Sequence, residues 1–141
     1  MTQERDVLRT LGTTMRTVRS HVDRTLQQTG LRLGQFQVLR HLWGDDGLTP
    51  RELATRLDVE MPTVTRTVQR MIRDGLVDRR AHPDDARSVR IYLTPRGRTL
   101  RAQLESLLEK ETERALRGFD AGERAALIRM LDALTENMRA D

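Results

Sequence analysis

The stretch from Thr49 to Thr94 limits the possible folds most strongly, because its pattern predicts two short helices, a tight turn and a β-hairpin. Thr49 can cap the first helix, Pro50 fits its first helical position, and Glu52 can close a capping box. The turn between the two helices is predicted at Asp58–Met61 and begins with Asp58. Glycine often stands in such turns, but aspartate tolerates the left-handed backbone conformation better than most residues.

The second helix is expected to begin at Pro62 and to end near Asp74, where Gly75 can provide a left-handed cap. Its apolar residues recur at intervals that predict one buried stripe: Val64, Val68, Met71 and Ile72. At about 100° per residue, the polar residues of the opposite face are Thr63, Arg66, Arg70 and Arg73. Such a face suits the major groove of DNA, although a lone charged stripe is usually only a solvated surface.

A hairpin is predicted after this helix. The segments Leu76–Ala81 and Val89–Leu93 are strand-like, and the seven residues His82–Ser88 between them are typical of a turn-rich tip. Leu48 is a candidate for a short strand that pairs with the hairpin. Two helices, a turn and an arginine-bearing hairpin together predict a winged helix-turn-helix.

Three motifs in this stretch resemble the MarR family of transcriptional regulators, and its SlyA-like members in particular. They are Pro62-Thr63-Val64-Thr65-Arg66-Thr67, Asp74-Gly75-Leu76-Val77-Asp78-Arg79-Arg80, and Asp85-Ala86-Arg87 with Leu93-Thr94 closing the wing. The flanking helices suit the family too, so the resemblance covers nearly the whole chain. It implies a mainly α (α+β) fold, a winged helix-turn-helix with long N- and C-terminal dimerisation helices.

The expected domain organisation follows from this resemblance. Residues 1–141 form a single MarR-type domain, with a DNA-binding lobe at 33–94 and a helical dimerisation region at 1–30 and 95–141. The flanking helices are predicted from about Gln3 to Gln28, 34 to 43, Pro95 to Gly118 and Asp120 to Met138. Their apolar stripes exceed what a winged helix can cover, which favours a homodimer over a monomer with a satellite bundle. A two-fold dimer presents two recognition helices about 34 Å apart and binds an inverted repeat.

Groove geometry assigns roles to the recognition helix. Thr63, Thr65 and Arg66 lie in its first turn and a half, the part that reaches base edges. The resemblance implies that Arg66 contacts guanine, and Arg70 is expected to reach a phosphate or a base. The N-terminus of the preceding helix, with Thr49 and Arg51, can bind a phosphate through backbone N–H groups.

The wing adds further candidates for DNA contact. The resemblance places Arg87 where the family's wing arginine enters the minor groove. Asp85, two residues earlier, is expected to hold the wing turn or to orient that arginine. Arg79, Arg80 and Arg90 are expected to contact the DNA backbone, with a structural ion pair as the alternative for one of them.

Composition narrows the class of protein. The chain has no cysteine, which excludes disulfides, thiolate metal sites and the cysteine switch used by the family's hydroperoxide-sensing branch. It has no run of 18 apolar residues and no signal segment, so we expect a cytoplasmic protein without membrane contact. Residues 49–98 hold 11 arginines and 7 acidic residues, so this segment carries the whole net charge of +4.

An enzyme is the first competing class, and the sequence disfavours it. The three histidines, His21, His41 and His82, occupy separate elements without a matching serine motif. The only lysine, Lys110, is not part of a phosphate-binding loop. A metal at His82, Asp84 and Asp85 is less expected than a solvated turn. No cofactor or metal is therefore predicted.

The predicted function is that of a dimeric, sequence-specific DNA-binding regulator, expected to be a repressor with a palindromic operator. The resemblance implies a small phenolic or aromatic carboxylate ligand between the dimer helices and the winged lobe. Candidate ligand-binding residues are His21, His41, Trp43 and Arg73, each equally explained by packing or surface exposure. The alternatives are a winged-helix protein-interaction module and a constitutive DNA-binding dimer without a ligand.

Overall fold

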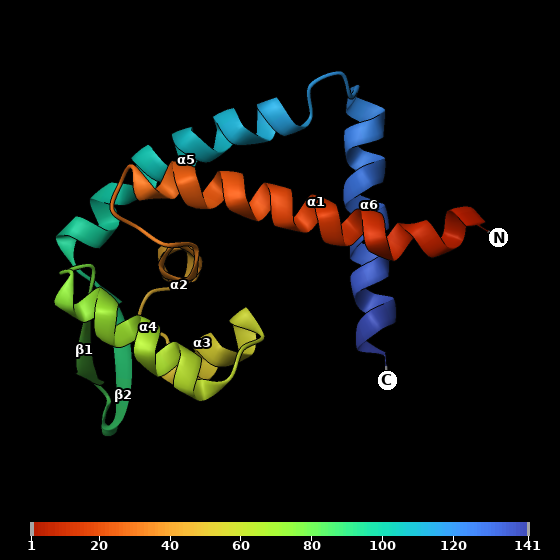
Figure 1. Ribbon diagram of the computed structural model, residues 1–141. Helices are drawn as coiled ribbons and strands as arrows, with labels where there is room; N and C mark the ends of the chain where they lie inside the picture. Colours follow the sequence, from red (N-terminus) through yellow and green to blue (C-terminus); the bar gives the residue numbers. More distant parts are fainter. Residues whose placement is uncertain (1, 141) are drawn as a thin grey trace. The chain divides into compact units, whose positions relative to one another are not determined.

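The computed structural model describes residues 2–140 and is mainly helical with one small antiparallel sheet, as the sequence predicted (Figure 1). The elements in chain order are α1 (Thr2–Gln27), α2 (Leu33–Gly44), α3 (Pro50–Leu57), α4 (Met61–Arg73), β1 (Val77–His82), β2 (Asp85–Leu93), α5 (Pro95–Ala115) and α6 (Ala121–Arg139). They form two compact units, Met1–Leu107 and Leu108–Asp141. None of the described helices is both long and apolar enough to cross a membrane.

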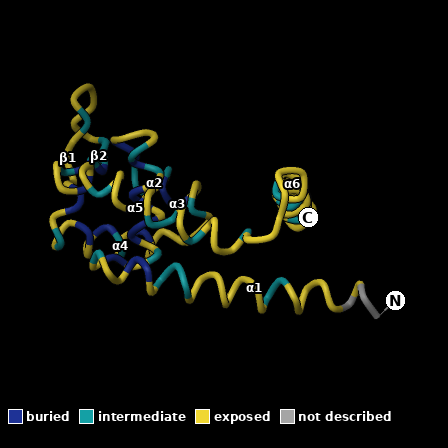
Figure 2. Tube along the Cα trace, turned by 90° about the horizontal axis from the view of Figure 1, so that it is seen from above, coloured by how far each residue is buried: buried dark blue, intermediate teal, exposed yellow. Residues whose placement is uncertain are grey.

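Helix α2 lies at the centre of the first unit. Its residues Val38, Leu39 and Leu42 are almost fully buried, and α2 packs against α1, α3, α4 and β2. Figure 2 shows the buried positions gathered where these elements meet, whereas residues 6–20 of α1 are exposed except for the half-buried Leu11 and Gly12. The winged helix-turn-helix therefore has a hydrophobic core of its own, which fixes the relative positions of its helices and its hairpin.

The buried stripe of α4 is narrower than the sequence indicated. Val64, Val68 and Met71 are buried, but Ile72 remains 38% exposed, so the prediction that it belongs to the stripe was wrong. Ile72 lies about 100° further around the helix than Met71, which turns it away from the core. The stripe of three residues is sufficient to define which face of α4 points outward.

Helix caps in the first unit follow the predicted pattern with small differences. Thr49 caps α3 as predicted, because the Glu52 N–H donates to Thr49 Oγ1 over 3.1 Å. The predicted capping box is not complete, since Glu52 Oε1 accepts from the Thr49 hydroxyl over 3.0 Å and not from the Thr49 backbone N–H. Helix α4 begins at Met61, one residue before the predicted Pro62. Asp58 has a left-handed backbone with φ of 55°, and Gly75 ends α4 with φ of 74°, as predicted.

The sheet contains the hairpin and one bridging residue from the loop after α2. Strands β1 and β2 pair antiparallel, and Leu48 bridges Ile91 on the other edge of β2, which confirms its predicted pairing. The Ile91 N–H donates to the Leu48 carbonyl over 2.8 Å, and the Gly47 N–H donates to the Ile91 carbonyl over 3.1 Å. β2 is thereby bonded on both sides near its end, which anchors the root of the wing.

The regular ladder of the hairpin joins Val77–Ala81 to Val89–Leu93, as the predicted strands require. Inside the predicted tip of His82–Ser88, His82 also pairs with Asp85, so Pro83 and Asp84 form a tight turn and β2 begins at Asp85. The register shift between Ala81 and His82 leaves residues 86–88 outside the regular pairing. Polar side chains satisfy the backbone at the tip, so the turn residues need not form a long loop.

The second unit contains α6 and the end of α5. The α6 N-terminus has the predicted capping box, with the Glu123 N–H donating to Asp120 Oδ1 over 2.8 Å and the Asp120 N–H donating to Glu123 Oε1 over 3.3 Å. Arg124 Nη1 lies 2.8 Å from Glu113 Oε1, and this hydrogen bond lowers the pKa of the Glu113 carboxyl. These contacts fix the turn that connects the two helices.

The start of α5 passes close to the end of α4. Gly97 is buried, and a Cβ atom added to it would overlap the Leu76 carbonyl oxygen. The Gly97 carbonyl also accepts the indole N–H of Trp43 over 2.8 Å. Because the obstacle is backbone, a larger residue cannot be accommodated by a change of rotamer.

We therefore expect Gly97→Ala to destabilise the protein by about 1–3 kcal/mol through overpacking. Gly44→Ala is the matched control, because a Cβ atom at Gly44 meets no atom within 4 Å and Gly44 lacks a positive φ. Urea denaturation followed by circular dichroism measures both variants. Equal unfolding free energies for the two variants would show that the close approach at Gly97 is not a constraint.

Candidate nucleic-acid interface

The outward face of α4 is polar and positively charged. Its exposed residues at helical spacing are Thr63, Arg66, Arg70 and Arg73. Arg73 Nε lies 3.7 Å from Asp74 Oδ1, whereas Arg66 and Arg70 make no ion pair within the described part of the chain. Two guanidinium groups of the helix thus keep their hydrogen-bond donors available to an external acceptor.

Thr65 differs from the other predicted contact residues of α4. Its side chain is exposed, and its hydroxyl donates to the Met61 carbonyl in the same helix over 3.0 Å. The hydroxyl oxygen can still accept a hydrogen bond, and the methyl group remains at the surface. Thr65 therefore offers an acceptor and an apolar contact rather than a donor.

The N-terminus of α3 is less open to a phosphate than the sequence suggested. The Thr49 side chain already accepts the Glu52 N–H, which is one of the free donors of the first turn. The Glu52 carboxylate lies at the same end of the helix and repels an anion. A phosphate contact by Thr49 and Arg51 stays a prediction.

Asp85 holds the backbone of the wing tip. Its Oδ1 accepts the Arg87 N–H over 3.0 Å, and His82 Nδ1 accepts the Asp84 N–H over 3.2 Å. The Arg87 side chain is exposed and has no ion-pair partner among residues 2–140. Of the two roles expected for Asp85, the structure contains the backbone contact that shapes the turn.

Arginines at the wing root lie on two faces of the sheet, because successive residues in a strand point to opposite sides. Arg79 lines a small hollow together with Thr65 and Gln69 of α4, so it lies beside the recognition helix. Arg80 points to the other face, where its guanidinium carbon is 4.3 Å from the Tyr92 ring centroid. Of these two arginines, Arg79 is the one that lies next to α4.

Arg90 has a structural contact. Its Nη1 donates to the Gly47 carbonyl over 3.1 Å, and its Nε is buried without a hydrogen-bond partner. The side chain is half-buried, unlike those of Arg80 and Arg87. It therefore connects the hairpin to the loop after α2, and this leaves fewer of its donors for the DNA contact that the sequence suggested.

The predicted ligand-binding residues His21, His41, Trp43 and Arg73 line none of the hollows described for residues 2–140. Trp43 packs edge-on against Phe36, with ring centroids 6.2 Å apart, and its indole N–H is taken by the Gly97 carbonyl. Burial, followed by the charges of Arg56 and Arg40, lowers the pKa of His41, so its imidazole is neutral near pH 7. Both side chains are accounted for by packing in the first unit.

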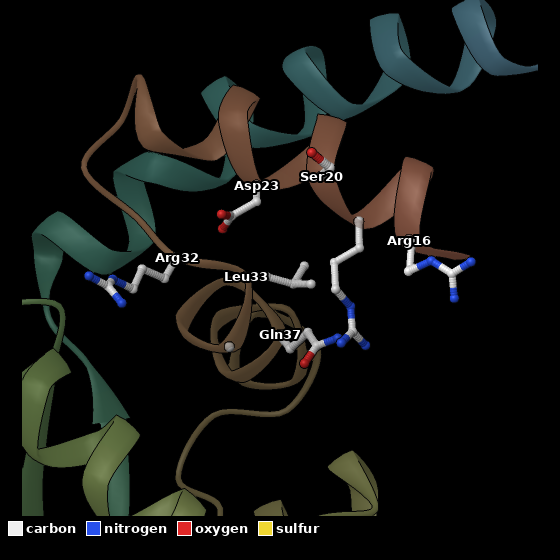
Figure 3. A pocket seen from close by; sticks show the side chains of 8 residues that line it. Arg16, Ser20, Asp23, Arg32, Leu33 and Gln37 are labelled. Atoms are coloured by element: carbon white, nitrogen blue, oxygen red, sulfur yellow. The ribbon is translucent and has the colours of Figure 1, made fainter. Parts of the chain in front are cut away.

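An open hollow of about 550 Å³ lies between α1 and α2 (Figure 3). Its lining residues are Arg16, Arg19, Ser20, Asp23, Arg32, Leu33, Gly34 and Gln37. None of His21, His41, Trp43 and Arg73 is among them. Three arginines make the hollow better suited to an anion than to a neutral molecule, and ligand binding stays a prediction.

The fold and this surface define the class of protein. A charged recognition helix, a preceding short helix and an arginine-tipped wing form a winged helix-turn-helix of the kind found in DNA-binding regulators. Within the described residues, no cluster of three or more histidine, aspartate or glutamate side chains could hold a metal ion.

Comparisons with known proteins give the family. The model of the MarR family matches residues 31–89. The HTH-type transcriptional repressor Mb2911 of Mycobacterium bovis is 35% identical over 118 residues, which are 83% of this chain and 84% of that protein. The chain belongs to the MarR family of transcriptional regulators, and the family and these relatives are regulators rather than enzymes.

Other relatives match over less of their length. The matched region is 32% identical to the regulator TtmR of Methylorubrum extorquens and covers 75% of this chain and 53% of that protein. For the repressor YetL of Bacillus subtilis the identity is 33%, over 77% of this chain and 66% of that protein. The chain thus spans about half to two thirds of these two curated relatives.

Solved structures have the same fold. The MarR family transcription regulator SP03579 superposes with a TM-score of 0.85 at 28% identity, covering 99% of this chain and 95% of that chain. A protein from Listeria monocytogenes that is named as a MarR family regulator, solved in complex with 26mer DNA, has a TM-score of 0.84 at 23% identity. The match covers 94% of this chain and 89% of that chain. The second likeness is a likeness of fold alone.

Proposed function

We propose that the chain is a homodimeric repressor that binds an inverted-repeat DNA operator in a sequence-specific manner. The observation that carries the proposal concerns Arg66 and Arg70, which lie on the face of α4 opposite its buried stripe. Both side chains are exposed, and neither forms an ion pair among the described residues. Side chains held in this way on a packed helix can enter the major groove without refolding. Relatives named as repressors and the Listeria protein solved with DNA support this function.

The side chains of α4 and of the wing suit different contacts with DNA. In this proposal Thr63, Thr65 and Arg66 read base edges, and Arg70 and Arg79 bind the phosphates that flank the same groove. Arg87 at the wing tip enters the adjacent minor groove, whose negative potential attracts arginine where the groove is narrow.

Assembly as a dimer is proposed from the uncovered apolar side chains of the long helices, each considered separately. On α1, Val7, Leu8, Met15 and Val18 are between 43% and 69% exposed. On α6, Ile128 and Met138 are 62% and 77% exposed, and no described residue of this 19-residue helix is buried. Such helices need packing for most of their stability, so a second copy of the chain is the expected cover.

The first test concerns base recognition by Arg66. Arg66→Ala is expected to weaken binding to a duplex selected by the wild-type protein from a random pool by about 1–3 kcal/mol, and to relax preference at one position of each half-site. Fluorescence anisotropy on selected and random duplexes, at several salt concentrations, measures the effect.

Arg73→Ala is the matched control, because Arg73 lies at the end of the same helix beside Asp74. This variant should lose less affinity for the duplex than Arg66→Ala, and its base preference should not change. An equal loss by Arg66→Ala on random duplex would reduce Arg66 to a phosphate contact. A wild-type protein that binds no duplex, or binds without steep salt dependence, would refute the proposed function.

The second test separates groove insertion from turn stability in the wing. Arg87→Ala is expected to weaken binding by about 1–3 kcal/mol per half-site on an operator with A·T-rich flanks, and by less on G·C-rich flanks. Asp85→Ala removes the acceptor for the Arg87 N–H and should give a loss that does not depend on the flanks. Equal, flank-independent losses for both variants would exclude the minor-groove role.

The third test concerns the dimer. The double substitution Ile128→Glu with Leu131→Glu places two charges on the exposed apolar face of α6 and should give a monomer at micromolar concentration with strongly reduced operator affinity. Arg129→Glu, on the same exposed helix, is the control and should remain dimeric. Sedimentation equilibrium measures the mass. A double variant that stays dimeric would show that α6 does not form the interface.

A further inference from the structure

Two like charges face each other in the middle of the hairpin. Arg80 of β1 pairs directly with Arg90 of β2, so both side chains lie on the same face of the sheet. Opposed like charges in a strand pair are destabilising. The structure separates them, since Arg90 turns to the Gly47 carbonyl and Arg80 turns to the ring of Tyr92.

Tyr92 is the diagonal neighbour of Arg80, two residues beyond the directly paired Arg90. A long side chain can reach this position, and the guanidinium carbon lies 4.3 Å from the ring centroid, within the range of a cation–π contact. No carboxylate forms an ion pair with Arg80 in the described part of the chain. The guanidinium beside the ring therefore has no carboxylate in direct contact among the described residues.

Gly47 packs against the ring of Tyr92. It has φ of 76°, and a Cβ atom there would lie 2.8 Å from Tyr92 Cε1 and 3.2 Å from Cζ. The Gly47 backbone thus packs against the hydroxyl-bearing edge of the ring. Hydrogen bonds from the Gly47 N–H to the Ile91 carbonyl and from Arg90 to the Gly47 carbonyl hold this loop against β2.

The contact with the ring restrains Arg80 without consuming its N–H donors, because the face of an aromatic ring attracts the charge and accepts no conventional hydrogen bond from it. The N–H groups of the guanidinium stay available and match a phosphate. Arg80 lies two residues before the end of β1, which places it about 7 Å along the strand from the tip. The phosphates that border a minor groove entered by the wing tip lie at a comparable distance, since the groove is about 6 Å wide.

We infer that Tyr92 is a positioning residue for DNA binding: its ring, supported by Gly47, holds the exposed Arg80 guanidinium as a phosphate contact beside the wing. The inference rests on the proposed DNA-binding function and adds a residue that touches no DNA itself. It also gives Arg80 and Arg90 different roles, one as a preorganised ligand of phosphate and the other as a structural tether.

The test compares Tyr92→Leu, Tyr92→Phe and Arg80→Gln on the selected duplex across a range of salt concentrations. Arg80→Gln should lower the slope of log K against log salt by about 1 per half-site. Tyr92→Leu should weaken binding about 2- to 5-fold per half-site, as expected for loss of an exposed cation–π contact. Tyr92→Phe keeps the ring and should bind like the wild type.

Combination of the variants separates positioning from a general structural effect. Tyr92→Leu should have no further effect in an Arg80→Gln background, but its full effect in an Arg66→Ala background. An equal loss in both backgrounds, or equal losses for Tyr92→Phe and Tyr92→Leu, would overturn the inference.

Arg80→Lys tests the same idea without altering Tyr92, in case Tyr92→Leu impairs folding. Lysine retains the charge but lacks the planar guanidinium, which can lie against the ring and donate two hydrogen bonds to a phosphate, so the affinity for the selected duplex should fall. Wild-type affinity for Arg80→Lys would overturn the inference. If Arg66→Ala impairs binding while the Arg80 and Tyr92 variants do not, the proposed function stands and only the positioning role fails. A wild-type chain that binds no duplex would refute both.

Discussion

The packing of one side of α4 is the constraint on which the rest of the proposed interface depends. Val64, Val68 and Met71 are buried against the lobe, and this fixes the rotation of the helix about its own axis. A helix rotated by one residue would move its outward face by about 100°. Arg66 and Arg70 can therefore act as a pair only while this stripe stays in the core. Stability of the lobe and presentation of the charged face thus have the same physical origin.

The loop that follows α2 has a comparable role for the wing. Asp46 Oδ1 accepts both the Gly47 N–H over 3.0 Å and the Leu93 N–H over 2.9 Å, and Asp46 Oδ2 lies 3.6 Å from Arg98. This carboxylate joins the loop to the end of β2 and the start of α5. Among the described residues, the hydrogen bonds of the tip beyond it are local and involve Asp85 and His82. A firmly held root and a locally stabilised tip suit the proposed insertion of the wing into a DNA groove.

The long helices contribute a different kind of constraint. The N-terminal part of α1 and the whole of α6 expose apolar side chains that a stable monomer would cover. The winged lobe, by contrast, encloses its own core around α2. The lobe therefore does not need the proposed dimer for its packing, but it needs the dimer to set the spacing of two recognition helices. In the proposed dimer the winged lobe contacts the bases, and the long helices set the two-fold symmetry that the operator must match.

Local signals in the sequence determined the helices, their caps and the class of fold, because a cap or a periodic stripe depends on residues within one or two turns. The Thr49 cap, the Asp120 capping box and the left-handed Gly75 were all predictable for this reason. Tertiary structure alone decided the exposure of Ile72 and the partners of the wing arginines. Arg79, Arg80 and Arg90 look alike in the sequence, but their surroundings in the fold differ. Arg79 lies beside α4, Arg80 contacts the ring of Tyr92, and Arg90 donates to the Gly47 carbonyl, with partners 10 to 43 residues away. These partners come from other segments of the chain, so no pattern of neighbouring residues predicts them.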